Sequence, residues 1–329
     1  MAINLLNIQP HKVSRDLSGY ITYIYGAAKV GKTTLCSQFP NALILAFEKG
    51  YNALPGVMVQ DILRWSEFRE VIRELKKPEV KERFSTIVVD TIDVAGSMCD
   101  KYICNQLGID SLGEGGWTVN GWSTYKKELE DCFRTITQLG YALVCISHDQ
   151  DKTFKRKDGS EYNQIVPTAQ KSVNNIIKDM ADLYLYATID SASKERKLII
   201  RSLDDTVDCG CRFKYIVNEI PLDYQALIDA LNNAIDKEAD EHGGRFVTDD
   251  KNQITSNEDA PDFDTLMTSF TELVGDLMSE NQSNAVKITA IVDKYLGKGK
   301  KVNDCTPAQS EQLELIVGEL KELFVKEGE

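Results

Sequence analysis

A glycine-rich stretch near the N-terminus has the residue types and the spacing that bind phosphate. It follows the pattern Gly-x-x-x-x-Gly-Lys-Thr and comprises Gly26, Ala27, Ala28, Lys29, Val30, Gly31, Lys32, Thr33 and Thr34. Glycines allow a tight turn whose backbone N–H groups surround a triphosphate, the lysine reaches its β- and γ-phosphates, and the first threonine hydroxyl ligates Mg²⁺. At the usual frequency of glycine, a chance match in a chain of this length has a likelihood of about one in a hundred. The stretch predicts a nucleotide site with Lys32 as its catalytic cation.

The flanks of this stretch favour a strand before it and a helix after it. Residues 20–25 are apolar, β-branched or aromatic, and residues 33–39 have a helical pattern. A strand that leads into a phosphate loop and then a helix is the context in which this pattern is most specific. We therefore interpret residues 26–34 as a phosphate loop and not as a chance glycine-rich turn.

Two acidic residues follow strand-like runs downstream of the loop. Residues 42–47 are continuously apolar and precede Glu48, and the β-branched run 84–89 precedes Asp90. Such runs are typical of buried parallel strands, whose carboxyl ends form the ligand-binding edge of an α/β sheet. Aspartate also ends many strands as a turn residue, so the phosphate loop upstream is what makes this one significant. We interpret 84–90 as a Walker B strand, in which Asp90 holds Mg²⁺ through water while Thr33 ligates it.

The order of the remaining patterns indicates the fold class. Helical spacing occurs at 62–76 and 123–138, and further strand-like runs occupy 141–148, 183–188 and 197–201. Alternating strands and helices predict an α/β fold with a mainly parallel, doubly wound sheet, whose short late strands pair antiparallel. We expect this core to span residues 1–236.

The last third of the chain changes in composition. Residues 237–261 are acidic and contain glycine and asparagine, which predicts a linker. Residues 262–329 contain three amphipathic helical patterns, which predict a small helical C-terminal domain whose apolar stripes form its core. The third pattern begins at Thr306 with Pro307 and Gln309, the signature of a capping box with proline at the first helical position.

Composition restricts the surroundings of the protein. No apolar run is long enough to span a bilayer, and the first residues lack the features of a signal peptide, so we expect a cytoplasmic protein (host cytoplasm if phage-encoded) without membrane contact. The eight cysteines lack the spacing of a zinc site and are expected to be reduced structural thiols. A net charge of −13 means that any nucleic acid must bind through a local basic segment.

The loop, Glu48, Asp90 and the strand that ends at His148 together resemble the RecA-like P-loop ATPases. They are most similar to the compact phage nucleotide-binding proteins that are linked to recombination and single-strand annealing, over about residues 10–235. The resemblance implies a RecA-like P-loop NTPase fold that hydrolyses ATP to ADP and phosphate with Mg²⁺. It implies that Glu48 orients the attacking water and that His148 is the polar sensor beside the γ-phosphate. The alternative for Glu48 is an acid that simply starts a loop, and the alternative for His148 is a histidine hydrogen-bonded within a loop. An Asn-Lys-x-Asp guanine signature is not apparent, which favours ATP over GTP.

The resemblance also implies single-stranded DNA as a partner. The segment after His148 occupies the place of the second DNA-binding loop of RecA-like proteins. Its residues expected to contact DNA are Lys152, Phe154, Lys155, Arg156 and Lys157, with Tyr162 as a second stacking residue. The alternative is a solvated charged hairpin tip around Asp158 and Gly159. The glycine-rich loop 105–122, with Trp117 and Trp122, is expected either to contact DNA as the first loop or to pack in the core.

RecA-like ATPases work as rings or filaments, so the resemblance implies a homo-oligomer. A neighbouring protomer usually supplies a cation to the γ-phosphate, for which Arg201 is the candidate by position and Arg212 a weaker one, unless either is a surface ion-pair residue. The C-terminal helices are not part of a RecA core and are expected to bind a partner such as a single-strand-binding protein, DNA or other protomers.

The function expected from the sequence is a Mg-ATP-dependent, ssDNA-binding ATPase of DNA recombination or single-strand annealing, as in phages. The alternatives are a nucleotide-gated DNA-binding assembly protein with little turnover, a helicase-loader-like RecA-fold motor and, less favoured, a phosphotransferase.

Overall fold

The structure is a computed structural model that describes residues 9–251 and 262–327 of the chain. These two ranges correspond to two compact units. The side chain of Trp117 lies outside the described part, and the expected contact of this residue with DNA or with the core therefore lies outside it too. Within the described ranges, none of the helices is both long and apolar enough to cross a membrane.

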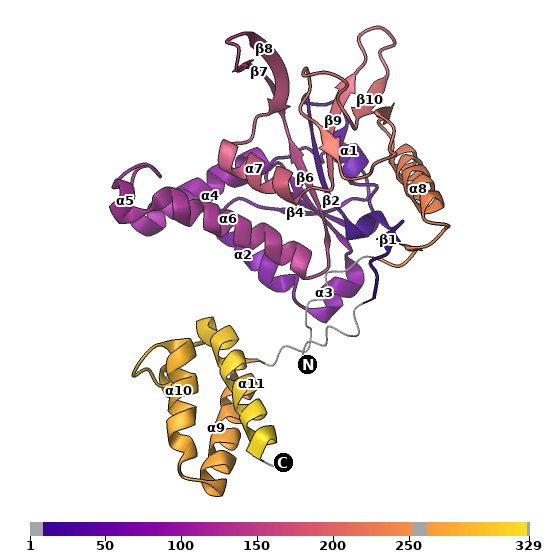
Figure 1. Cartoon of the computed structure of the whole chain (residues 1–329). Helices are drawn as coiled ribbons and strands as arrows, with labels where there is room; N and C mark the ends of the chain where they lie inside the picture. Colours follow the sequence, from indigo (N-terminus) through magenta and orange to yellow (C-terminus); the bar gives the residue numbers. More distant parts are fainter. Residues whose placement is uncertain (1–8, 252–261, 328–329) are drawn as a thin grey trace. The chain divides into compact units, whose positions relative to one another are not determined.

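A nine-stranded sheet forms the centre of the unit at residues 9–251 (Figure 1). Its strands are β2 (Ile21–Gly26), β3 (Ala42–Ala46), β4 (Met58–Asp61), β5 (Thr86–Asp90), β6 (Ala142–Ser147), β9 (Leu183–Ile189), β10 (Arg196–Ile199), β11 (Gly210–Cys211) and β12 (Glu219–Pro221). The strand order is β12-β10-β9-β2-β6-β5-β3-β4, and β11 also pairs with β9. Strands β9, β2, β6, β5, β3 and β4 run parallel, whereas β10, β11 and β12 are antiparallel to their neighbours. The predicted α/β fold with late antiparallel strands is confirmed.

Helices cover both faces of this sheet, as Figure 1 shows. One face packs against α2 (Trp65–Glu74), α4 (Ile92–Leu107), α6 (Gly121–Gln138) and α7 (Lys171–Met180), and the other against α1 (Lys32–Cys36) and α8 (Tyr224–Glu241). Side chains alternate between the faces, so Ile87 and Val89 of β5 join the first core and Val88 joins the second. Burial on both faces explains why the central strands are continuously apolar in sequence. The short helices α3 (Pro78–Arg83) and α5 (Gly116–Val119) complete this set.

The core unit extends past the predicted boundary at residue 236. Helix α8 continues to Glu241 because Ala234, Ile235 and Ala239 keep one of its faces buried. Strand β13 (Val247–Thr248) then pairs in parallel with β1 (Val13–Ser14), next to the short helix η2 (Leu17–Gly19). Residues 237–251 are therefore not a linker, and their acidic composition was misleading because the acids of α8 lie off the buried face that Ala239 continues. The rest of the predicted linker, 252–261, lies outside the described residues.

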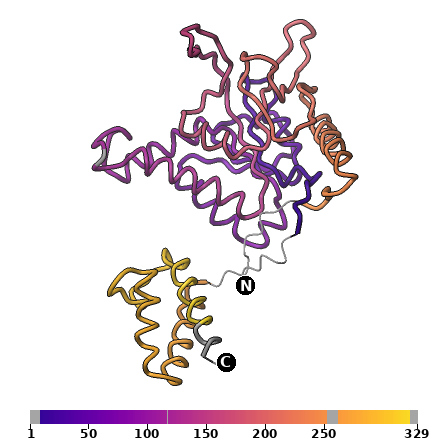
Figure 2. Tube along the Cα trace, viewed as in Figure 1, coloured from indigo at the N-terminus to yellow at the C-terminus, as the bar shows by residue number. Residues whose placement is uncertain are grey.

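A separate two-stranded hairpin follows β6 directly. It consists of β7 (Asp149–Lys155) and β8 (Glu161–Pro167), paired antiparallel with Phe154 opposite Tyr162. Figure 2 traces this hairpin as it extends away from the helices that cover the sheet. The segment predicted to bind DNA is thus an ordered ribbon that begins one residue after His148.

The unit at residues 262–327 is a bundle of three helices. They are α9 (Phe263–Glu280), α10 (Asn284–Leu296) and α11 (Ser310–Glu327), and the short helices η3 (Val302–Asp304) and η4 (Pro307–Gln309) connect the last two. Their core includes Leu277, Leu313 and Leu320, each fully buried. The predicted capping box is present, since the backbone N–H of Thr306 donates to Gln309 at 3.1 Å. The three predicted helices are confirmed.

Candidate functional site

The phosphate loop joins the carboxyl end of β2 to α1, and two of its positions need glycine. An alanine Cβ at Gly26 would lie 2.1 Å from the carbonyl oxygen of Ala187 in the adjacent strand, so only a bare backbone fits. Gly31 has φ +114°, in the left-handed region that disfavours side chains. The two glycines therefore fix the tight path that leads the loop into the N-terminus of α1.

Lys32 is held inside this loop. Its Nζ donates hydrogen bonds to the carbonyl oxygens of Gly26, at 2.6 Å, and of Ala27, at 2.9 Å. The residue is only 6% exposed, and burial lowers the pKa of its ammonium group. The positive charge of this buried ammonium group, surrounded by the backbone of the loop, is one that a bound phosphate would neutralise.

Thr33 and Asp90 come together at the edge of the sheet. The Thr33 hydroxyl donates to Oδ2 of Asp90 at 3.0 Å, although the two residues are far apart in sequence. Asp90 is 3% exposed, and burial raises the pKa of its carboxyl group, which the Thr33 hydrogen bond partly opposes. A hydroxyl and a carboxylate are hard oxygen ligands of the kind that Mg²⁺ prefers.

The space beside this pair fits a small hydrated cation. A Cβ at Gly50 would lie 3.1 Å from Oδ2 of Asp90 and 3.3 Å from Oγ1 of Thr33. The missing side chain at Gly50 therefore leaves room next to both oxygens. No cluster of three or more His, Cys, Asp or Glu that could cage a metal occurs among the described residues.

Glu48 and His148 face each other across the same pocket. His148 Nε2 lies 3.4 Å from Glu48 Oε2, and the Thr91 hydroxyl donates to Glu48 Oε1 at 2.9 Å. Glu48 follows β3 and His148 follows β6, and β5 lies between these two parallel strands, so both residues reach the same edge of the sheet on either side of Asp90. The two side chains are 40% and 34% exposed, so they are anchored but remain open to a ligand.

One pocket of about 350 Å³ brings together Lys32, Thr33, Glu48, Asp90 and His148. These are residues that sequence reasoning selected from four separate segments. The carboxyl ends of β2, β3, β5 and β6 meet at this edge, which is where α/β sheets bind ligands. The pocket can hold a triphosphate, a hydrated cation and a water molecule positioned by a carboxylate.

The two arginines expected as candidates for a cation supplied to a neighbouring protomer are hydrogen-bonded or ion-paired within their own chain. The guanidinium of Arg201 donates hydrogen bonds to the carbonyl oxygens of Phe213 and, at 2.9 Å, of Lys214. Arg212 is paired with Asp182 at 3.4 Å, at the amino end of β9. Neither lines the pocket.

Arg196 lines the pocket instead, at the start of β10. Sequence reasoning missed it because it lies in the charged run 194–197, which is typical of an exposed turn.

The residues predicted to contact DNA all lie on the β7–β8 hairpin or its tip. The Phe154 and Tyr162 rings are stacked with centroids 5.6 Å apart. Lys155 is paired with Glu161, Arg156 with Asp205, and Lys157 is exposed. In the other predicted DNA loop, Trp122 is 49% exposed and packs edge-to-face on Tyr125, so it is only partly a core residue.

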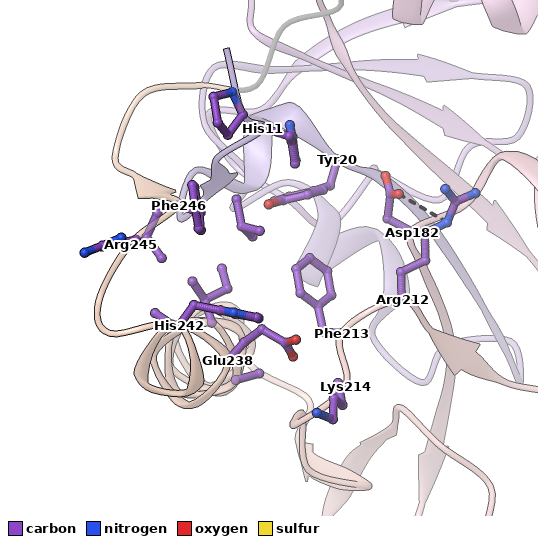
Figure 3. A pocket seen from close by; sticks show the side chains of 16 residues that line it. His11, Tyr20, Asp182, Arg212, Phe213, Lys214, Glu238, His242, Arg245 and Phe246 are labelled. Carbon is purple, nitrogen blue, oxygen red and sulfur yellow. Dashed lines mark ion pairs between the residues drawn. The ribbon is translucent and has the colours of Figure 1, made fainter. Parts of the chain in front are cut away.

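A second pocket, of about 650 Å³, lies between the N-terminal strand, α8 and residues 212–214 (Figure 3). The rings of Tyr20, Phe213 and Phe246 form much of its wall, and the Asp182–Arg212 ion pair lies at its edge. It is larger than the phosphate-loop pocket but contains none of the loop residues. Its size alone does not make it the site of chemistry, since it lacks a convergent set of catalytic groups.

The fold and the site together define a P-loop NTPase with a RecA-like arrangement of its central sheet. A profile of the AAA domain family, a family of P-loop ATPases, matches residues 18–213, and the chain belongs to this family. The chain is also 28% identical over 333 aligned residues to the SPbeta prophage-derived uncharacterized protein YorG of Bacillus subtilis (strain 168). That alignment covers 99% of this chain and 100% of the relative. Neither similarity concerns DNA or recombination.

Proposed function

We propose that this protein is a Mg²⁺-dependent ATPase that binds single-stranded DNA and acts in DNA recombination or single-strand annealing. The observation that carries the ATPase part is the 3.0 Å contact between Thr33 and Asp90, in the pocket that also holds Lys32. The Thr33 hydroxyl would ligate Mg²⁺ directly and Asp90 through water, while Lys32 and the loop N–H groups bind the phosphates. The metal would neutralise phosphate charge during transfer to water.

Glu48 is proposed to position the water that attacks the γ-phosphate, so that ATP and water give ADP and phosphate. Its two oxygens are oriented by Thr91 and His148, which restrict its rotation. Fixing a carboxylate in this way lowers the entropic cost of aligning the nucleophile.

The DNA part of the proposal rests on the difference between the two faces of the β7–β8 hairpin. Because side chains alternate along a strand, Lys152 and Phe154 share one face with Tyr162. Lys152 Nζ lies 5.4 Å from the Phe154 ring centroid, and the Arg156 guanidinium lies 4.4 Å from that of Tyr162.

The opposite face of the hairpin carries the acids. Asp151 and the Lys155–Glu161 pair lie there, next to Thr153 and Asn163. The strand residues of the aromatic face therefore combine two stacking rings with Lys152 and include no carboxylate, whereas Arg156 at the end of this face is paired with Asp205. This is the combination that binds single-stranded nucleic acid without sequence preference, and it offsets the overall negative charge of the chain.

The hairpin is joined directly to the nucleotide site. His148, which contacts Glu48, is followed at once by β7, and its carbonyl accepts from the N–H of Thr168 at 3.0 Å, just after β8. Binding of DNA to the hairpin would therefore act on the residue that holds the water-positioning acid. This supports a further part of the proposal, that single-stranded DNA stimulates ATP turnover.

Assembly remains part of the same proposal. The resemblance to RecA-like ATPases supports a homo-oligomer, as a ring or filament. The three-helix unit would bind a partner such as a single-strand-binding protein.

The ATPase part is tested with Lys32→Ala. Removing the central cation is expected to abolish Mg-ATP turnover, measured as phosphate release from the full chain. Lys126→Ala, on the exposed side of α6, is the control and should retain the wild-type rate. Unchanged turnover in Lys32→Ala would refute the assignment of the site.

The DNA part is tested with two matched double variants of the hairpin. Phe154→Ala with Tyr162→Ala removes the stacking pair, and Thr153→Ala with Asn163→Ala removes the neighbouring cross-strand pair on the opposite face. Stacking contributes about 1–3 kcal/mol per base, so the first variant should bind an oligo-dT strand at least about 10-fold more weakly in an anisotropy titration. Equal loss in both variants would contradict binding by the aromatic face. A wild-type rate that does not respond to DNA would favour a nucleotide-gated binding protein.

A further inference from the structure

Arg196 brings a cation to the phosphate loop from a part of the chain far beyond it. The residue lines the same pocket as Lys32 and Asp90. Its Nη1 atom lies 3.3 Å from the position that a Cβ on Gly31 would occupy, so the guanidinium rests directly against the loop. The bare backbone of Gly31 is what allows this close approach.

The backbone of Arg196 is fixed from both sides. It is paired with Ile189 across the β9–β10 turn, and its carbonyl oxygen accepts a hydrogen bond from the N–H of Leu222 at 3.0 Å. Arg196 and Leu198 lie on the same side of β10, because side chains alternate along a strand. Leu198 is fully buried in the core between the sheet and α1, so this side of β10 faces the loop and its helix.

Arg196 differs from the adjacent Lys197 in its ion pairing among the described residues. Lys197, on the other side of the strand, is paired with Asp190 at 3.3 Å and with Glu219 at 3.0 Å. Within the described parts of the chain, no ion pair involves the Arg196 guanidinium. Its planar group with several N–H donors is therefore available for a ligand whose oxygens it can bind in a bidentate manner.

We propose that Arg196 binds the α- and β-phosphates of the nucleotide, and that it does so within the same chain as the loop. The inference rests on the proposed nucleotide function and extends it to a phosphate-binding residue outside the loop. The loop backbone surrounds the α- and β-phosphates, whereas the lysine reaches the β- and γ-phosphates. A cation that lies beside Gly31, next to the loop backbone, would therefore bind the phosphates that ATP and ADP share. Arg196 sets the affinity for both nucleotides.

The test compares Arg196→Ala with Lys197→Ala in the full chain. A fluorescent ADP analogue is displaced by ATP, by ADP and by inorganic tripolyphosphate. Loss of one charge-assisted bidentate contact is expected to weaken all three competitors by about 10-fold in Arg196→Ala. Lys197→Ala should bind all three like the wild type, and Arg196→Lys should be intermediate because it keeps the charge without the planar fork.

Three results would overturn the proposal. Equal binding by Arg196→Ala and Lys197→Ala would show that Arg196 does not contact the ligand. A loss for ATP alone would place the contact at the γ-phosphate. A loss for ATP and ADP but not for tripolyphosphate would place it at the nucleoside.

A mixing experiment tests whether the arginine acts within its own chain. Lys32→Ala and Arg196→Ala proteins are combined, and turnover is measured below saturating ATP. An arginine that serves its own chain gives the average of the two separate rates. A rate above that average would mean that a neighbour supplies Arg196, which would overturn this part. Absence of nucleotide binding by the wild type would instead refute the proposed function itself.

Discussion

Gly50→Ala tests the metal site without changing the phosphate loop, Glu48 or Asp90. The new methyl carbon would lie 3.1 Å from Oδ2 of Asp90 and 3.3 Å from Oγ1 of Thr33. A metal-bound water that donates to Asp90 would lie about 2.7 Å from the same carboxylate oxygen. The methyl group therefore occupies the shell in which that water must lie, and it cannot donate a hydrogen bond.

The expected cost follows from the lost contact. A hydrogen bond to a charged group contributes about 1.5–3 kcal/mol, and Gly50 is exposed, so we take the lower end. This corresponds to about a 10-fold loss of Mg-nucleotide affinity. Gly50 does not have a positive φ, and its new methyl group needs a shift of only a few tenths of an ångström from the Asp90 and Thr33 side chains, so the fold should form.

The assay is calorimetric titration of ADP in the presence of Mg²⁺ and in the presence of EDTA. Gly50→Ala should lose affinity with Mg²⁺ and match the wild type in EDTA, because only the metal-linked contacts are affected. Gly210→Ala is the matched control, since its Cβ would meet no heavy atom of the described chain within 4 Å. Equal losses with and without Mg²⁺ would refute the reasoning, because they would mean that the methyl group disturbs the loop and not a metal site.

Three further predictions concern pH, Arg201 and the C-terminal unit. Burial raises the pKa of Asp90, so Mg-ADP affinity should fall as the pH drops through that pKa and the metal-binding carboxylate is protonated. Burial lowers the pKa of Lys32, so affinity should also fall as the pH rises through that pKa and the phosphate-binding cation loses its charge. In EDTA the loss of affinity at low pH should disappear from the titrations. Arg201→Ala removes two hydrogen bonds to backbone carbonyls, so thermal unfolding should show a loss of about 1 kcal/mol with unchanged turnover. Lost turnover would instead support the expected role of Arg201 as a cation supplied to a neighbouring protomer. Leu313→Ala leaves a cavity worth about 2–5 kcal/mol in the three-helix unit, so calorimetry should show an earlier transition for that unit while ADP binding is unchanged.

The nucleotide site could be predicted from the sequence because its signals are local. The spacing within residues 26–34 encodes the loop, and the apolar runs before Glu48 and Asp90 encode buried strands whose ends meet at one edge. In such a fold, a residue at the carboxyl end of a parallel strand lies at the ligand-binding edge of the sheet, so its position follows from the strand alone. His148 follows the same rule, at the end of β6.

Arg196 could not be found in the same way, because its position depends on pairing between segments. The register of β10 on β9 decides that Arg196 faces the loop and that Lys197 faces its acidic partners. A shift of one residue would exchange them, and the sequence has no local signal for this register. The same limit applies to β13, whose two residues are held by long-range pairing with β1.

The faces of the β7–β8 hairpin depend on register too. Opposite pairing of Phe154 and Tyr162 gathers the rings on one face, although charge counting along the sequence suggests only a mixed, solvated segment. Composition was a poor guide in such places because it averages over faces that have different neighbours.

The most direct test of the account is electron microscopy of the full chain with a non-hydrolysable ATP analogue, Mg²⁺ and single-stranded DNA. We expect phosphate density within the loop between Lys32 and Arg196, metal density beside Thr33 and Asp90, and a DNA strand along Phe154 and Tyr162. Nucleotide density in the pocket of Tyr20 and Phe213, or a loop without phosphate, would contradict it.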